Sequence, residues 1–160
     1  MEEIIKQISK VKREKLGTEI PILVFRALRH YTDIYATDLL GENAAHILFI
    51  NAGKSLGKAL GRELYDTDLS KYLENIVKFI EEEKIGLLKI THFDDEKLVV
   101  QLDECITCAG MDNIGKRICF FEVGLVAGFV ENYLGKKVIA QETKCNANGE
   151  ETCEVTVNLK

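Results

Sequence analysis

Residues 142–155, ETKCNANGEETCEV, place two cysteines on either side of an Asn148-Gly149 dipeptide, between segments with the composition of β-strands. Asn-Gly between such segments is a strong signal for a hairpin. Cys145 and Cys153 are each four residues from Gly149, so a turn centred there sets them opposite each other, with Cβ atoms about 4.5–5.5 Å apart. This separation suits a disulfide, two ligands of one metal ion, or plain burial. The stretch predicts an antiparallel ribbon and leaves three explanations for its thiols.

The rest of the chain changes its apolar period once, from helical spacing to strand-like runs. The helical spacing predicts helices over residues 2–15, 21–40, 44–64 and 68–83. A first hairpin follows in residues 85–102, with DDEK as its turn, and a further helix over residues 118–135 precedes the second hairpin. Since hairpins form antiparallel sheet, the order predicts an α+β fold, in which N-terminal helices pack on a four-stranded antiparallel sheet made of two hairpins separated by a helix.

The helix over residues 44–64 carries Gly53, Gly57 and Gly61 on one face, because they are spaced by four residues. Each glycine costs about 1 kcal/mol relative to alanine in a helix, so a close approach of another backbone is expected to compensate. Lys54 and Lys58 interrupt the stripe, which argues against a membrane helix. The stripe therefore predicts tight packing against another helix, in this chain or in a second copy.

The 160 residues suit a single domain over 1–160, with an N-terminal helix and loop over 1–20 and a core over 21–158. The net charge of −5 argues against nucleic-acid binding, which needs clustered Lys and Arg. Apolar runs are too short for a membrane span, and the charged N-terminus lacks a signal core. We therefore expect a cytoplasmic protein. Stable disulfides are uncommon there and five cysteines is an odd number, so metal binding or burial is favoured.

A structural zinc ion needs four protein ligands. Spacing alone nominates the C-x-x-C pair Cys105 and Cys108 together with Cys145 and Cys153, since two cysteine pairs are the usual pattern of an all-thiolate zinc site. Other candidate ligands are Cys119, in RICFF, and Glu142, in QETKC. The alternative is that all five thiols are simply buried. The residues alone leave these possibilities open.

The segment CFFEVGLVAGFVENYLGKKVIAQETKCNANGEETCEVTV resembles the C-terminal signature of the 4-vinyl reductase domain family. In that signature a cysteine opens a glycine-containing helix, a strand brings Glu-x-x-Cys, and a second cysteine follows eight residues later. Upstream, AAHILFINAGKSLG is similar to the family's helix with two glycines four residues apart, and the resemblance covers roughly residues 20–158. It implies a structural zinc held by Cys119, Glu142, Cys145 and Cys153, with Cys105 and Cys108 as the runner-up pair. Strict strand alternation opposes this set unless the strand bulges or ends before Cys145.

The resemblance also implies a ligand-binding fold, shared in outline with sensor domains of aromatic-responsive regulators, haem-dependent nitric-oxide sensors and a vesicle-tethering subunit. It implies a homodimer through the N-terminal helices, and a sensor or carrier for a hydrophobic small molecule. The predicted cavity lies between the sheet and the helices. Facing positions suggest Phe93, Leu98, Val100, Val123 and Ala140 as its lining.

Three alternatives stay open. The family name suggests an enzyme of tetrapyrrole or other small-molecule reduction, although a four-ligand zinc is closed to substrate and the sequence has no dinucleotide-binding or P-loop motif. His30 and His46 suit packing or surface roles, and His92 is the histidine able to face a cavity, with no paired carboxylate visible beside it. A dimerisation scaffold would have a filled interior. A haem protein is a weak alternative, because the three histidines are scattered.

Overall fold

The computed structural model describes residues 2–160, with side chains from residue 4 onward. The chain forms two compact units, residues 1–45 and 46–160, which are described separately. The first unit contains α1 (Glu2–Ile8), α2 (Ile22–Leu40) and the start of α3 (Glu42–Glu63). Helix α1 is shorter than the predicted 2–15. Ser9 bonds back to the carbonyl of Ile5, and the basic residues that follow leave little apolar surface to hold a longer helix.

The second unit carries the sheet. Its elements after α3 are α4 (Leu69–Glu82), β1 (Leu87–Phe93), β2 (Lys97–Asp103), α5 (Phe120–Leu134), β3 (Ile139–Lys144) and β4 (Cys153–Asn158). The strand order is β1-β2-β4-β3, with antiparallel pairing throughout. The predicted α+β class and the two hairpins separated by a helix are confirmed. The pairing of β2 with β4 joins the hairpins into one sheet, with Leu102 opposite Cys153.

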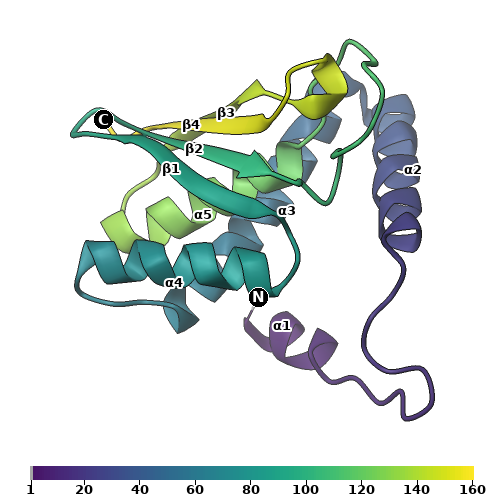
Figure 1. Cartoon of the computed structure of the whole chain (residues 1–160), viewed down its shortest axis with the longest axis horizontal. Coiled ribbons are helices and arrows are strands. Elements are labelled where there is room, and N and C mark those ends of the chain that lie inside the picture. The colour runs from purple at the N-terminus through teal and green to yellow at the C-terminus, as the bar shows by residue number, and fades with distance from the viewer. Residues whose placement is uncertain (1) are drawn as a thin grey trace. The chain divides into compact units, whose positions relative to one another are not determined.

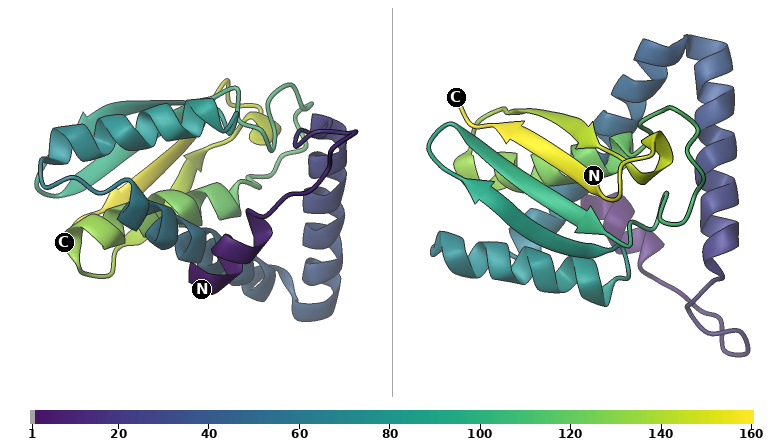
Figure 2. Two further views of the ribbon diagram at one scale, coloured as in Figure 1. Left: turned by 90° about the horizontal axis from the view of Figure 1, so that it is seen from below. Right: turned by 45° about the horizontal axis from the view of Figure 1, so that its top comes forward.

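Helices α4 and α5 cover one face of this sheet (Figure 1 and Figure 2). The carboxylate of Asp68 caps α4 by accepting a hydrogen bond from the Ser70 N–H. Tyr72, Ile76 and Ile80 follow at helical spacing and are buried. On the sheet, Leu98, Val100 and Leu102 alternate with more exposed residues, so one face of β2 meets the helices. No helix within residues 2–160 combines the length and hydropathy needed to cross a bilayer.

The part of α3 in the second unit crosses α5 at backbone distance. A Cβ atom at Gly53 would overlap the carbonyl oxygen of Phe121, and one at Gly57 would overlap that of Leu125. The approach is reciprocal, because Gly124 and Gly128 of α5 lie against the backbone of α3. The close packing predicted from the glycine stripe is confirmed, and the partner helix is α5 of the same chain.

Glu131, near the end of α5, is a buried carboxylate that fastens α5 to α3. Its oxygens lie 2.8 and 2.6 Å from the Nζ atoms of Lys54 and Lys58, and it accepts a hydrogen bond from the Val138 N–H at 3.1 Å. Burial alone would raise the pKa of Glu131, but the two lysines and the Val138 N–H outweigh it and hold the pKa at about 2. The folded state therefore favours the charged carboxylate.

Replacing Glu131 with glutamine is expected to lower the free energy of unfolding by about 2–3 kcal/mol at pH 7, because two lysines lose their partner. The native pKa of about 2 lies below the ordinary 4.5, so this contribution is present above about pH 4.5 and is lost as pH falls towards 2. Urea unfolding at pH 7 and pH 3 measures it. The gap between wild type and Glu131→Gln should narrow at pH 3, whereas exposed Glu74→Gln should change little at either pH. An equal gap at both pH values would contradict the assignment.

Candidate functional site

Five cysteine side chains meet at one end of the second unit, between the sheet and the start of α5. We refer to Cys105, Cys108, Cys119, Cys145 and Cys153 as the cysteine cluster. Each is at most 2% exposed, and within the described residues none forms a disulfide. The Sγ atom of Cys119 lies 3.4–3.8 Å from those of the other four, and Cys108 lies 3.1 Å from Cys153. The cluster is a compact, buried set of sulfur donors.

The first two thiols come from the turn that follows β2. Glu104 has a left-handed backbone with φ 51°, which is uncommon for a residue with a side chain, and it turns the chain inward. The carbonyl of Cys105 then accepts hydrogen bonds from the N–H groups of Cys108 and Ala109. This single helical turn points both thiols the same way, as C-x-x-C spacing favours. Because Leu102 pairs with Cys153, the turn lies next to the start of β4.

The other donors come from α5 and the second hairpin. Cys119 precedes α5, and its N–H donates to Oε2 of Glu142 on β3 at 3.0 Å. The ladder between β3 and β4 shifts register between Glu142 and Lys144, and β3 ends at Lys144. The strand thus both bulges and ends before Cys145, which is what joint binding by Glu142 and Cys145 requires. The loop across the hairpin is longer than a tight turn, because residues 146–148 form a 3-10 turn before Gly149.

The cluster offers two overlapping sets of four donor atoms, each with all its members within 4.8 Å of one another. One set is Cys119, Glu142, Cys145 and Cys153, the ligands implied by the family resemblance. The other joins Cys105 and Cys108 to Cys119 and Cys153. Oε1 of Glu142 is buried and accepts no hydrogen bond from the described residues, as expected of an oxygen placed to bind a cation. Three thiolates and a carboxylate suit a four-coordinate zinc ion.

Electrostatics within the cluster limit how much charge its donors can carry by themselves. Burial, and secondly the negative charge of Cys145, raise the pKa of Glu142 to about 9. The pKa of Cys119 is raised, first by its hydrogen bond with Cys105 and then by those with the other three thiols. Hydrogen bonds with Cys108 and Cys119 lower the pKa of Cys145 to about 6. A divalent cation reverses this limit, because its charge stabilises every deprotonated ligand.

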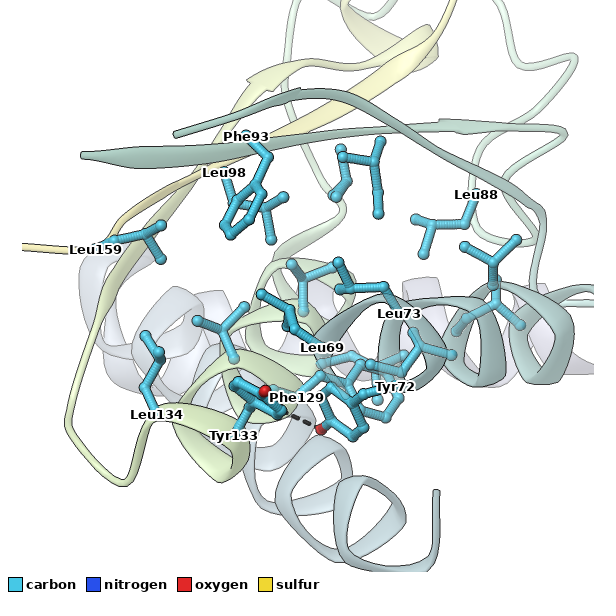
Figure 3. A pocket seen from close by; sticks show the side chains of 18 of the residues that line it. Leu69, Tyr72, Leu73, Leu88, Phe93, Leu98, Phe129, Tyr133, Leu134 and Leu159 are labelled. Carbon is cyan, nitrogen blue, oxygen red and sulfur yellow. Dashed lines mark hydrogen bonds between the residues drawn. The ribbon is translucent and has the colours of Figure 1, made fainter. Parts of the chain in front are cut away.

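A cavity of about 280 Å³ lies between the sheet and helices α4 and α5, next to the cluster (Figure 3). Its wall is almost wholly apolar. Charged residues line it at two places: Asp94, Asp95 and Lys136 follow the ends of β1 and α5, and Glu122 lies in the first turn of α5. The hydroxyl of Thr107 donates to Oε1 of Glu122 at 2.5 Å. Because Thr107 lies between Cys105 and Cys108, this bond links the cavity wall to the cysteine cluster.

The structure places three of the five expected lining residues, Phe93, Leu98 and Val100, on the cavity wall. Val123 lies in a second apolar cluster between α5 and the sheet, and Ala140 packs against that cluster. Sequence reasoning named no lining residue on α4, although Tyr72 and Ile76 line the cavity. Their position on the apolar stripe of α4 was the signal that pointed to them.

The histidines do not converge on the cavity. His46 stacks on Phe120 with ring centroids 3.7 Å apart, which is the expected packing role. The expectation for His92 was wrong. Its side chain is exposed, it is absent from the cavity wall, and its Nε2 lies 2.7 Å from Oδ2 of Asp94. The DDEK turn that follows β1 brings this carboxylate beside it.

Comparisons with known proteins agree with the geometry. The family model of the 4-vinyl reductase domain matches residues 98–159. The uncharacterized protein MJ0150 of Methanocaldococcus jannaschii is 32% identical over 145 residues, which cover 91% of this chain and 79% of that protein.

Three solved structures share the fold. The phenol-responsive sensory domain of the transcription activator PoxR, with phenol, aligns with a TM-score of 0.68 at 15% identity, over 89% of this chain and 76% of that chain. Subunit 3 of a trafficking protein particle complex from Naegleria fowleri, covalently bound to palmitic acid, gives 0.62 at 18% identity, over 88% and 97%. A vinyl-4-reductase family protein from Methanocaldococcus jannaschii gives 0.62 at 19% identity, over 99% and 88%.

The cysteine-rich hairpin, the matched segment and the long alignment with MJ0150 lead to one assignment. The chain belongs to the 4-vinyl reductase domain family.

Proposed function

We propose that this protein is a cytoplasmic sensor or carrier domain that binds a hydrophobic small molecule in the cavity between α4, α5 and the sheet. The observation that carries the proposal is an apolar cavity inside an otherwise packed unit. A volume of about 280 Å³ exceeds that of an engineered apolar cavity of about 150 Å³ that binds benzene. A dimerisation scaffold would have a filled interior, so the cavity favours ligand binding over that alternative.

Two probes follow from the proteins of similar fold, phenol from PoxR and palmitic acid from the trafficking subunit. The described residues that line the cavity include no cysteine. We therefore expect this chain to hold its ligand without a covalent bond. Since Glu122 and the Asp94–Asp95 pair are acceptors when ionised, they favour a ligand with a hydrogen-bond donor, such as a phenol, over a carboxylate.

We propose further that a structural zinc ion is held by Cys119, Glu142, Cys145 and Cys153. It would tie the start of α5 to the second hairpin and thereby fix one end of the cavity. The buried Oε1 of Glu142, within 4.8 Å of three thiols, supports this set. Buried thiols without disulfides suit a reducing compartment, which supports the cytoplasmic location.

A homodimer through the first unit completes the proposal. Helix α2 carries exposed apolar side chains along its length, including Leu23, Leu28 and Leu39, and such surfaces are typical of interfaces. Light scattering coupled to gel filtration tests it. The expected mass is that of two chains, and a single-chain mass at micromolar concentration would contradict it.

Binding of a suitable phenol at one hundred times its dissociation constant is expected to stabilise the protein by about 2.7 kcal/mol. For a chain of this size that is a rise in melting temperature of roughly 5–10 °C. Val126→Phe should abolish the rise, because Val126 lines the cavity and a larger ring fills it. Val11→Phe, on an exposed residue outside the second unit, should keep it. An equal rise in both variants would show that the ligand binds elsewhere.

A further inference from the structure

The cysteine cluster contains more donors than one ion can use. A four-coordinate zinc takes four ligands, and the set implied by the family leaves Cys105 and Cys108 over. Both are 0% exposed, and both lie within bonding reach of the same sulfurs. Simple burial would not require a C-x-x-C turn with a left-handed Glu104 to bring two further thiols onto Cys119 and Cys153.

We propose that the cluster holds two zinc ions bridged by the thiolates of Cys119 and Cys153. Cys105 and Cys108 complete the first ion, and Glu142 with Cys145 completes the second. This proposal rests on the zinc site proposed above and adds a second ion to it. It follows from the overlap of the two donor sets, which share those two cysteines and no others.

The number of donors matches the arrangement. Two four-coordinate ions that share two bridging ligands need six donors, two terminal ones on each ion and two between them. The cluster supplies five sulfurs and one carboxylate oxygen. The two sulfurs shared by both sets belong to residues on different elements, the start of α5 and the start of β4, so each lies between the C-x-x-C turn and the end of β3.

The sulfur separations also match. With zinc–sulfur bonds of about 2.3 Å at tetrahedral angles, two thiolates on one ion lie about 3.8 Å apart. Cys119 lies 3.7 Å from Cys105 and 3.8 Å from both Cys145 and Cys153. The amide of Asn146 lies 3.5 Å from the Sγ atom of Cys153 and can donate to a bridging thiolate.

The charge balance favours the second ion once the first is bound. One zinc ion with three thiolates and a carboxylate has a formal charge of −2 in a buried site. The second Zn²⁺ binds as the Cys105 and Cys108 thiols release two protons to solvent, so two positive and two negative charges are added. The buried formal charge stays at −2, and no oxidation or reduction takes place. The second ion is therefore bound without burying further net charge.

Metal stoichiometry of the full chain tests the proposal. Protein reconstituted anaerobically with zinc under reducing conditions, freed of excess metal and weighed by native mass spectrometry, should carry two zinc ions per chain. Cys105→Ser and Cys108→Ser should each carry one, and Ala109→Ser, on the same turn, should carry two. One ion in wild type that both serine variants keep would overturn the bridged pair and leave the single zinc site standing.

A second result would point to a different site. One ion in wild type that is lost in Cys108→Ser would indicate a single all-thiolate ion on Cys108, Cys119, Cys145 and Cys153, whose printed separations also lie between 3.1 and 3.9 Å. That outcome overturns the inference and also the ligand set proposed above. No bound zinc in any protein would overturn both proposals together.

Cobalt reconstitution tests the bridge without any variant, so it does not depend on whether the variants fold. Thiolate-to-cobalt absorption should rise up to two equivalents of Co²⁺. The electron paramagnetic resonance signal per cobalt should fall as the second equivalent binds, because thiolate bridges couple the two spins. Saturation at one equivalent, or an undiminished signal per cobalt at two equivalents, would contradict a bridged pair.

Discussion

Replacing Cys119 with serine is expected to abolish zinc binding and to lower the melting temperature by roughly 8–16 °C, the equivalent of about 4 kcal/mol for a chain of this size. Cys119 belongs to both donor sets and its sulfur contacts those of all four other cysteines. Loss of this ligand leaves a buried carboxylate and several thiols without the cation that compensates them. Structural zinc contributes its binding energy directly to folding.

The matched change Cys105→Ser separates a ligand effect from a packing effect. It removes one fully buried sulfur of the same cluster but leaves Cys119, Glu142, Cys145 and Cys153 intact. Metal analysis should find zinc in Cys105→Ser and none in Cys119→Ser. Zinc retained by Cys119→Ser and lost by Cys105→Ser would reject the proposed ligands. Thermal unfolding with and without a chelator then shows how much of the stability depends on the metal.

Gly57→Ala is expected to destabilise the fold by about 3 kcal/mol or more, at the upper end of what overpacking costs. The added methyl group would overlap the backbone carbonyl of Leu125, and neither helix can yield by rotating a side chain. Helix α3 must then separate from α5. Since α5 lines both the cavity and the cysteine cluster, zinc and ligand affinity should fall as well.

The control is Asn51→Ala on the same helix, where the side chain is exposed. Alanine has the higher helix propensity in both cases, so propensity alone predicts stabilisation of both variants. Urea unfolding should show a strong loss for Gly57→Ala and little change for Asn51→Ala. Stabilisation of both would mean that α3 and α5 do not approach as closely as the structure has them.

Much of this fold follows from local sequence. Asn148-Gly149 and the DDEK turn mark the hairpins, and the spacing of Gly53, Gly57 and Gly61 announces a close helix contact. The identity of the partner helix does not follow, because the matching glycines, Gly124 and Gly128, lie about seventy residues away and gain meaning only when the two helices meet. Helix α1 was overextended because its apolar spacing continues through Val11 after the stabilising contacts have ended.

The site shows the same division between local and long-range information. The C-x-x-C spacing and the eight-residue separation of Cys145 from Cys153 identify candidate ligands. Their convergence depends on the pairing of β2 with β4, which places Leu102 opposite Cys153 and thereby brings the turn of Cys105 to the second hairpin. The bulge at Glu142 is likewise a property of the ladder between β3 and β4. The hydrogen bond from Thr107 to Glu122 had no signal in the sequence.

Metal content of the native protein tests the central claim most directly. Protein isolated without chelators and with its thiols protected should, in native mass spectrometry, carry at least one zinc ion on every chain, and removal of that zinc should weaken the binding of phenols in the cavity. A metal-free chain with five reduced thiols, unchanged thermal stability in the presence of a chelator, and unaltered ligand affinity would contradict the account.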